Sequence, residues 1–216
     1  MVATPIGNLE DISLRAKRIL LETPVIACED TRHTGNLLKI LNNQEPVNKK
    51  YISIRDFNEQ ATIQKIIIEL QNSDVALVSD AGTPLISDPG YKLINLCKNS
   101  NIKVVPIPGP CAAITALSGA GLPTNKFLFL GFLPKKWEIR PEETTIIYES
   151  PKRVNQTIQL ISQRYPNAKI VIAHELTKIH EEIFELSTIN HELSTKGEYT
   201  ILVYRPSDSD QSYPTE

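Results

Sequence analysis

The sequence lacks the features that mark several large classes of protein. Its three cysteines, Cys28, Cys97 and Cys111, are widely spaced and form no CxxC pair, so neither a disulfide scaffold nor a zinc site is indicated. No apolar run approaches the length of about 18 residues that a transmembrane helix needs, and the N-terminus does not resemble a signal peptide. The net charge of −2 argues against binding nucleic acid through bulk electrostatics alone. We therefore expect a cytoplasmic protein with free thiols, no metal and no membrane contact.

Motifs for phosphate binding and for common hydrolases are also missing. There is no GxGxxG or GxxxxGK[ST] segment, so neither a dinucleotide nor a nucleoside triphosphate is indicated. There is no HExxH, and no serine lies in a GxSxG frame. Glu175, Glu181 and Glu182 lie near His180 and could hold a metal, but we expect them to be surface charges. Any ligand must therefore be recognised without a phosphate-binding loop.

Short apolar runs alternate with amphipathic stretches over the first half of the chain. Strands are expected at residues 25–28, 51–54, 75–78 and 103–107, with a stub of a further strand at residues 2–3. Helices are expected at residues 13–21, 31–41, 59–71, 91–98 and 111–117. Strands that alternate with helices predict βαβ units and a mostly parallel sheet.

The order of expected strands and helices changes after Gly121-Leu122-Pro123. Strands are expected at residues 127–131, 144–148, 169–173, 182–186 and 199–204, with one long helix at residues 151–165. We predict an α/β protein with two α/β domains. Residues 1–118 would form an N-terminal parallel domain and residues 119–206 a C-terminal mixed one, followed by a flexible tail at 207–216.

The segment SDAGTPLISDPG, residues 79–90, holds two Asp, two Gly and two Pro directly after an expected strand. A connecting turn needs only about two to six residues, and ligands bind at the carboxyl ends of parallel strands. Asp80 could accept hydrogen bonds from ligand hydroxyls or face a positive ligand, and Gly82 permits close backbone approach. We favour ligand contact over a turn alone. Asp88 is expected to be the N-cap of the next helix, with Pro89 as its first residue.

A series of motifs follows along the chain: VATPIGNLEDIS, ACEDTRHTGNLL, VALVSDAGTPLISDPGYKL, VVPIPGPCAAITALSGAGLP, FLGFLP, YESPKR, ELTKIHEE and KGEY. In this order they resemble the ribosomal RNA small subunit methyltransferase I family, in the tetrapyrrole-methylase-like class of S-adenosylmethionine (SAM) enzymes. The resemblance runs from Val2 to about Val203, and SDAGTPxISDPG with PIPGP is its most specific part. It implies two α/β domains with SAM in a cleft between them, and a homodimer. It also implies 2′-O-methylation of a cytidine ribose in the decoding centre of 16S rRNA, within the small ribosomal subunit.

The resemblance further implies which residues bind SAM. In the first half of the chain they are Pro5, Ile6, Asp80, Ala81, Gly82, Thr83, Pro108, Gly109, Cys111 and Ala112. In the second half they are Tyr148 and Gly197, the latter in the turn Lys196-Gly197-Glu198. SAM carries an amino acid, a ribose, an adenine and a sulfonium but no phosphate. A short acidic side chain and small residues suit such a ligand, in agreement with the missing phosphate motifs.

The segment CEDTRH supplies the catalytic candidates. Methyl transfer from a sulfonium is an in-line displacement, so the protein mainly positions the reactants. A ribose hydroxyl is a poor nucleophile when neutral, so a base or hydrogen-bond acceptor should help. The candidates are Glu29, Asp30, Arg32 and His33. Arg32 could instead hold the target phosphate. Alternatively, Asp30 and Thr31 cap the following helix and the charges pair on the surface.

Basic residues in the second half could face RNA. They are Lys135, Lys136, Arg140, Lys152 and Arg153, and a solvated surface is the alternative. Trp137 and Phe132 could stack on an unpaired base, although packing is expected for Phe132. The segment between GFLP and YESP and the first strand are both shorter than the family has. Two other functions stay open: a tetrapyrrole methyltransferase, whose GxGxGD-type opening is replaced here by ATPIGNLED, or a non-catalytic SAM- or RNA-binding homologue.

Overall fold

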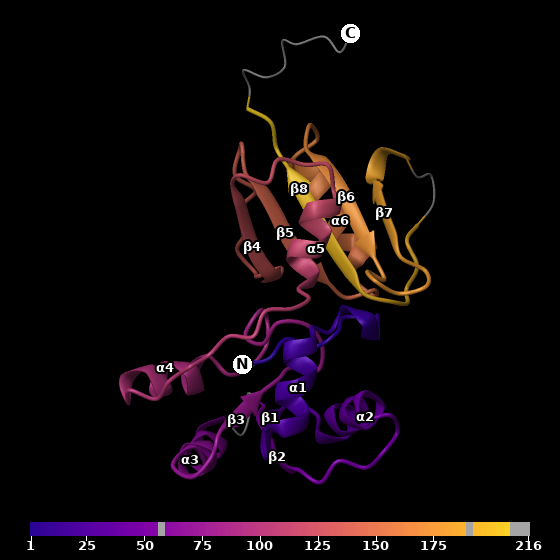
Figure 1. Cartoon of the computed structure of the whole chain (residues 1–216). Helices are drawn as coiled ribbons and strands as arrows, with labels where there is room; N and C mark the ends of the chain where they lie inside the picture. Colours follow the sequence, from indigo (N-terminus) through magenta and orange to yellow (C-terminus); the bar gives the residue numbers. More distant parts are fainter. Residues whose placement is uncertain (56–58, 189–191, 208–216) are drawn as a thin grey trace. The chain divides into compact units, whose positions relative to one another are not determined.

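The computed structural model describes residues 1–55, 59–188 and 192–207. The chain divides into two compact units, Met1–Cys111 and Ala112–Glu216 (Figure 1). This division lies before the helix that ends at Gly119, whereas the sequence places a domain boundary after residue 118. Residues 208–216 of the expected tail lie outside the described residues. Within the described ranges, none of the helices combines the length and apolar character needed to cross a bilayer.

A parallel sheet forms the centre of the first unit. Its strands are β1 (Val25–Cys28), β2 (Lys50–Ser53) and β3 (Val75–Leu77), in the order β2-β1-β3. Residues 1–3 lie beside β3, because the Val2 N–H donates to the Leu77 carbonyl (2.9 Å). Val2 also forms a parallel bridge with Ile107. The expected stub of a strand is thus confirmed, and the strand expected at 103–107 is reduced to this bridge.

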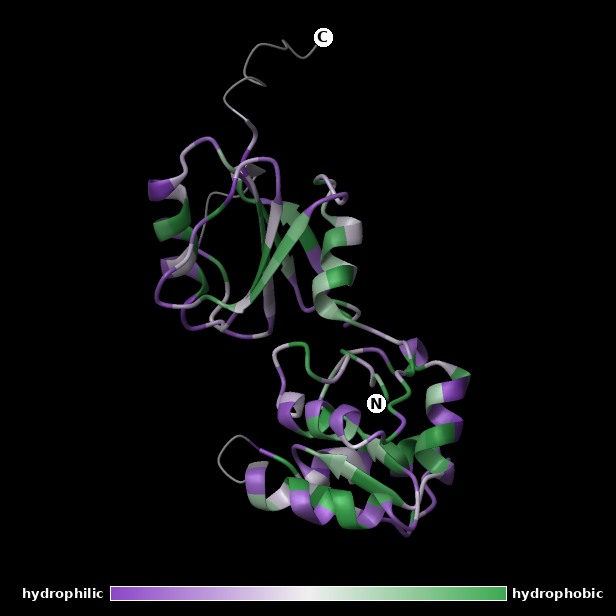
Figure 2. Cartoon of the chain, turned by 90° about the vertical axis from the view of Figure 1, so that its left-hand side faces the viewer, coloured by the Kyte–Doolittle hydropathy of each residue, from purple (hydrophilic) through white to green (hydrophobic). Residues whose placement is uncertain are grey.

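Helices cover both faces of this sheet. They are α1 (Leu14–Glu22), α2 (Thr31–Leu41), α3 (Glu59–Leu70) and α4 (Tyr91–Asn99), with a short 3-10 helix, η1 (Leu9–Asp11). Ile26 of β1 belongs to a core cluster with α1 and α2, whereas Ala27 belongs to one with α3 and α4, as expected for successive residues of a strand. Hydrophobic residues concentrate on the strands and on the helix faces toward them (Figure 2). Because both faces are covered, the loops at the strand ends remain for ligand contact.

The second unit contains a five-stranded mixed sheet, as predicted. Its strands are β4 (Phe127–Phe132), β5 (Thr144–Glu149), β6 (Lys169–His174), β7 (Glu182–Glu185) and β8 (Tyr199–Tyr204), in the order β4-β5-β8-β6-β7. Only the β4–β5 pair is parallel. The helices are α5 (Ala112–Gly119), α6 (Val154–Arg164) and a 3-10 helix, η2 (Leu186–Thr188). Helices α5 and α6 pack on opposite faces of the sheet (Figure 1).

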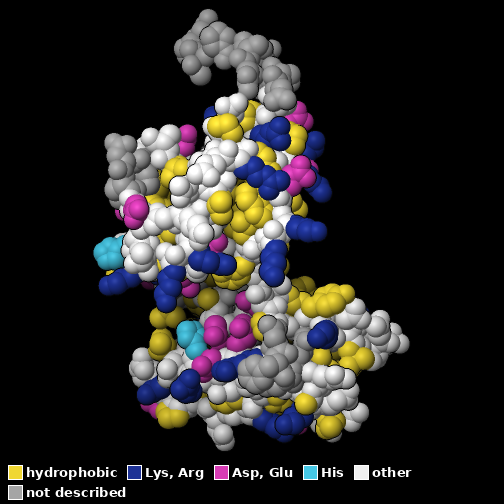
Figure 3. Space-filling model, turned by 180° about the vertical axis from the view of Figure 1, so that it is seen from behind, with side chains coloured by type: hydrophobic (Ala, Val, Ile, Leu, Met, Phe, Trp, Pro, Cys, Tyr) yellow, Lys and Arg dark blue, Asp and Glu magenta, His cyan; other side chains and the backbone are white. Residues whose placement is uncertain are grey.

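The strand register shows which residues lie together at each end of the strands of this mixed sheet, and we name these two ends. Tyr148 pairs with Thr200, and His174 pairs with Tyr199, so these residues lie at the same end of the strands, which we call the Tyr148 edge. At the other end of the strands, Tyr204 of β8 pairs with both Thr144 and Lys169, directly before Arg205; we call this the Arg205 edge. Lys and Arg side chains are visible on the surface of both units (Figure 3).

Candidate functional site

Three loops of the first unit meet at the carboxyl end of its sheet. The Thr4 N–H donates to the Gly82 carbonyl (2.9 Å), and the Gly82 N–H donates back to the Thr4 carbonyl (3.1 Å). The Thr83 Oγ1 donates to the Pro110 carbonyl (2.9 Å). The structure therefore brings the predicted residues of the TPIGN, SDAGTP and PIPGP segments together, although they lie far apart in the sequence.

Two glycines allow these loops to approach closely. Gly82 has a φ of +80°, and a Cβ there would lie 3.2 Å from Ile6 Cγ2 and 3.6 Å from the Pro110 carbonyl oxygen. A Cβ on Gly109 would lie 2.8 Å from the Ala3 Cβ. Both positions therefore need glycine for packing, and Gly82 needs it for its backbone conformation as well. Ala81, Pro108 and Gly109 themselves are exposed, so their backbone groups are accessible.

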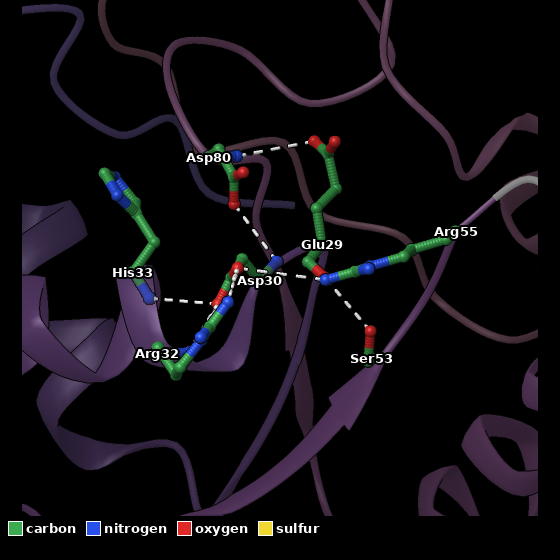
Figure 4. Close-up of polar contacts among 7 residues, drawn as sticks. All are labelled: Glu29, Asp30, Arg32, His33, Ser53, Arg55 and Asp80. Atoms are coloured by element: carbon green, nitrogen blue, oxygen red, sulfur yellow. Dashed lines mark hydrogen bonds and ion pairs between the residues drawn. The ribbon is translucent and has the colours of Figure 1, made fainter.

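A carboxylate pair joins the ends of β1 and β3. The Asp80 Oδ1 accepts a hydrogen bond from the Asp30 N–H (3.1 Å), and the Asp80 N–H donates to the Glu29 Oε1 (3.4 Å). Figure 4 shows Glu29 extending past Asp30 toward the backbone of Asp80. Because β1 and β3 are neighbours in the sheet, this contact places two catalytic candidates beside a SAM-binding candidate.

Asp30 is engaged as a helix cap. Its Oδ1 accepts hydrogen bonds from the backbone N–H groups of Arg32 (2.8 Å) and His33 (3.3 Å) at the start of α2. Its Oδ2 lies 3.2 Å from Arg32 Nη2 and 3.8 Å from Arg55 Nη2. The hydrogen bond from the Arg32 side chain, with those from the backbone, lowers the pKa of Asp30 to about 2. A carboxylate with this pKa is a weak base at neutral pH, so the capping interpretation fits Asp30, and Thr31 is not the cap.

Glu29 and Arg32 differ in where their side chains lie. The Glu29 carbonyl accepts hydrogen bonds from Ser53 Oγ and Arg55 Nε, both at 3.0 Å, which fixes its backbone. Its carboxylate is thereby directed to the Asp80 loop (Figure 4). The Arg32 side chain is 88% exposed. Of the catalytic candidates, Glu29 is the carboxylate best placed to act on a ligand beside Asp80.

The expectation that Asp88 caps the next helix is wrong. Helix α4 begins at Tyr91, and its N-cap is Gly90, with a φ of +124° and no side-chain capping bond. Asp88 is instead half-buried beside Ser79 and Asp80. Burial raises its pKa, a hydrogen bond with Ser79 opposes this, and the charge of Asp80 adds to the rise. Asp88 thus belongs to the surroundings of Asp80, which the capping interpretation missed.

Tyr148 is tied to the first turn of α5 in the second unit. Its Oη accepts a hydrogen bond from the Ala113 N–H (3.0 Å), next to the SAM-binding candidate Ala112. Its ring makes edge-to-face contacts with Phe129 (5.0 Å between centroids) and Phe132 (6.3 Å). These contacts fix the ring at the Tyr148 edge. Cys111, the neighbour of Ala112, is partly buried with a free thiol.

Gly197 lies in a turn on the same edge, with a φ of +92°. A Cβ there would collide with the His174 imidazole, so the position requires glycine. The Glu198 N–H donates to Glu175 Oε1 (2.9 Å), and Lys178 Nζ bridges the two carboxylates. This network joins the ELTK and KGEY motifs, which lie about 20 residues apart in the sequence.

Acidic groups near His180 show no metal geometry. Over residues 1–55, 59–188 and 192–207, no group of three His, Cys, Asp or Glu side chains is arranged to hold a metal ion. Glu175 is instead paired with Lys178.

The basic RNA-facing candidates fall into two separate groups. Lys135, Lys136 and Arg140 are exposed in the segment that packs at the C-terminal end of α6, where Arg164 Nη1 donates to the Trp137 carbonyl (3.0 Å). Lys152 and Arg153 precede the N-terminal end of this 11-residue helix. Such a helix is about 16 Å long, so the five residues do not form one patch. Trp137 packs against the core rather than standing free, whereas Phe132 is 54% exposed.

Arg153 also serves the fold. Its Nη2 lies 2.7 Å from Glu149 Oε1, and the Glu149 side chain is only 1% exposed. The other Glu149 oxygen accepts a hydrogen bond from Thr157 Oγ1 (2.7 Å). The charge of Arg153 is therefore largely used to neutralise a buried carboxylate.

We expect Arg153→Ala to lower the free energy of unfolding by about 2–3 kcal/mol, because Glu149 keeps its hydrogen bonds but loses its counterion. Lys152→Ala, which removes a neighbouring exposed charge, is the control and should change stability by less than about 0.5 kcal/mol. Urea denaturation followed by circular dichroism measures both. Equal stability of the two variants would contradict the structural role of Arg153.

The family model for Tetrapyrrole (Corrin/Porphyrin) Methylases matches residues 1–190. Ribosomal RNA small subunit methyltransferase I of Hydrogenobaculum sp. (strain Y04AAS1) is 52% identical over 191 residues, which cover 84% of this chain and 82% of the relative. The chain belongs to the tetrapyrrole methylase family. The enzyme of the same name from Vibrio cholerae serotype O1 is 43% identical over 235 residues, covering 100% of this chain and 80% of the relative. Within the family, the chain therefore groups with the ribosomal RNA small subunit methyltransferase I proteins.

Solved structures of other tetrapyrrole methylases share the fold. A uroporphyrin-III-C-methyltransferase from Thermus thermophilus has a TM-score of 0.66 at 15% identity, covering 94% of this chain and 92% of that one. A cobalt precorrin-4 methyltransferase has a TM-score of 0.63 at 12% identity, covering 94% and 92%. At these identities the likeness concerns the fold, and it confirms the predicted two-domain α/β class.

As a tetrapyrrole methylase family member, the protein is a SAM-dependent methyltransferase. The residues of the first unit fit this cofactor. Gly82 and Gly109 allow the three loops to pack closely at the carboxyl end of the sheet, where ligands of parallel α/β proteins bind. Asp80 Oδ2 accepts no hydrogen bond within the described residues, which leaves it available to a ligand hydroxyl. For all the named residues, in the first unit as well as for Tyr148 and Gly197, the SAM-binding role stays a prediction.

Proposed function

We propose that this enzyme methylates the 2′-oxygen of a cytidine ribose in the decoding centre of 16S rRNA. The observation that carries the proposal is the 52% identity to a relative named ribosomal RNA small subunit methyltransferase I over 84% of the chain. The substrate would be the small ribosomal subunit or its rRNA. We further propose that the enzyme acts in the cytoplasm as a homodimer.

Residues at the carboxyl end of the parallel sheet would carry the reaction. SAM supplies a methyl group on a positively charged sulfur, which passes to the ribose oxygen in one displacement and leaves a neutral thioether. Asp80 would accept a hydrogen bond from a hydroxyl of SAM, and the loops around Gly82 and Gly109 would hold the cofactor by their backbone groups. Glu29 would accept the proton of the 2′-hydroxyl, because its carboxylate is directed to the Asp80 loop. Asp30 would cap α2 and thereby position Glu29.

Labelled methyl transfer tests this function. Small ribosomal subunits that lack the modification are incubated with the enzyme and methyl-labelled SAM, and the product is mapped by nuclease digestion and mass spectrometry. We expect one methyl group on the 2′-oxygen of a cytidine. Methylation of a base, or of no rRNA nucleotide, would overturn the proposal.

A tetrapyrrole acceptor is the second candidate, because the structural neighbours include a uroporphyrin-III-C-methyltransferase. The same assay with uroporphyrinogen III as acceptor separates the two functions. Transfer to this acceptor alone would favour the alternative, and transfer to the rRNA alone would exclude it.

A further inference from the structure

A basic pocket lies at the Arg205 edge of the second unit. It is a cavity of about 210 Å³ between the C-terminal end of α6 and the end of β8, and it is lined by Arg164, Tyr165 and Arg205 among others. The guanidinium carbons of Arg164 and Arg205 lie 5.4 Å and 5.8 Å from the centroid of the Tyr165 ring. We call these three residues and their cavity the arginine pocket.

Backbone and side-chain hydrogen bonds build this pocket. The Ile139 N–H donates to Tyr165 Oη (3.1 Å), which fixes the ring. The Glu142 N–H donates to the Arg205 carbonyl (2.9 Å), which fixes the end of β8. Arg164 also lies over the Trp137 ring, 4.9 Å from its centroid. The guanidinium groups are therefore held by a packed aromatic and backbone frame.

The positive charge of the pocket comes from Arg164 and Arg205. In the part of the chain that the structure describes, neither Arg164 nor Arg205 forms an ion pair with a carboxylate. Arg153, by contrast, is paired with Glu149. Arg164 uses one nitrogen for the Trp137 carbonyl, and other donors of its planar fork remain. Two such groups over one ring present a site for an anion.

Size and chemistry indicate a phosphodiester. The cavity of about 210 Å³ is smaller than the roughly 300–1,000 Å³ of sites for whole small molecules. Guanidinium groups bind phosphate oxygens in a bidentate manner, and the aromatic frame suits an unpaired base nearby. Lys135, Lys136 and Arg140 lie exposed in the segment that packs against Arg164, but this segment also contains Glu138, Glu142 and Glu143 and adds no net charge to the pocket.

The pocket lies at the opposite end of the strands from Tyr148, which is predicted to bind SAM. Strand β8 has six residues and separates the Arg205 edge from the Tyr148 edge by about 20 Å. If SAM binds at the Tyr148 edge as predicted, a ligand that also reaches the arginine pocket must extend over this distance, as an RNA strand can.

We propose that the arginine pocket binds a backbone phosphate of the rRNA substrate, several nucleotides away from the methylated ribose, and anchors the RNA on the enzyme. The inference rests on the proposed function. The arginine pocket would be a second binding site, separate from the motifs that are predicted to bind SAM.

Binding of the double variant Arg164→Gln/Arg205→Gln to small ribosomal subunits tests the pocket. We expect its affinity to fall about 10-fold or more, and the slope of log K against log salt concentration to become shallower by about 1–2. Affinity for SAM, measured by calorimetry, should not change. The matched control is Arg18→Gln on α1, which removes an exposed arginine that is already paired with Glu22. Equal affinity and salt slope for the two variants would overturn the proposal.

Two further measurements separate the pocket from other causes. Arg164→Lys keeps the charge but loses the planar, bidentate guanidinium, so we expect the salt slope to be retained and the RNA affinity to be intermediate. If Arg164→Lys instead lost as much affinity as Arg164→Gln and had an altered circular dichroism spectrum, Arg164 would have a structural role only. Inorganic phosphate should compete with RNA only weakly. Saturation by phosphate without any effect on RNA affinity would show a site for the free anion instead. If the wild-type enzyme methylates rRNA but the variants keep its KM, the pocket fails while the proposed function stands.

Discussion

Gly82→Val is expected to reduce the affinity for SAM by at least about 100-fold. The backbone φ of +80° is strained for any β-branched residue, and a Cβ would lie 3.2 Å from Ile6 Cγ2. Relief of that contact displaces either the TPIGN loop or the Pro110 carbonyl at 3.6 Å, and both loops are proposed to hold the cofactor. Isothermal titration with SAM measures the effect.

Gly121→Val is the matched control for this substitution. Gly121 has a similar φ of +66°, but no atom lies within 4 Å of the Cβ position. The two valines therefore share the backbone strain and differ in steric contact. We expect Gly121→Val to bind SAM as the wild-type enzyme does. If folded Gly82→Val, checked by circular dichroism, also bound SAM normally, the segment 79–90 would not belong to the SAM site.

Glu29→Gln is expected to lower kcat for rRNA methylation by about 10²–10³-fold, within the range of about 10²–10⁴-fold that a general base typically contributes. The amide oxygen can still accept the hydrogen bond from the Asp80 N–H, so the loop and the affinity for SAM should be preserved within a few-fold. Single-turnover methyl transfer at saturating SAM separates this loss from a binding defect.

Asp30→Asn tests whether Asp30 acts as a helix cap while Glu29 acts as the base. Asparagine is as good an N-cap as aspartate, so α2 should stay intact. Because the pKa of Asp30 is lowered to about 2, its carboxylate contributes little as a base, and we expect kcat to fall less than about 10-fold. If Glu29→Gln kept its activity while Asp30→Asn lost it, Asp30 and not Glu29 would be the base.

The sequence by itself determined the fold class and most of the elements. The strand expected at 25–28 and the helix expected at 31–41 have the same bounds in β1 and α2, because apolar periodicity and a local cap are properties of neighbouring residues. The concentration of turn residues in 79–90 likewise marked a loop that packs against two others. Asp88 was misread because Gly90, at a φ of +124°, delays the helix by two residues.

Only the tertiary structure decided which charged groups are used in ion pairs or helix caps and which can contact a ligand. Arg153 and Arg205 look alike in the sequence, yet Arg153 neutralises the buried Glu149, whereas Arg205 lines a pocket and has no carboxylate partner among the described residues. Glu29 and Asp30 are adjacent, yet one reaches toward Asp80 and the other caps a helix. The physical reason is that burial and ion pairing depend on strand register and packing between distant segments. Local patterns in the chain do not contain these contacts.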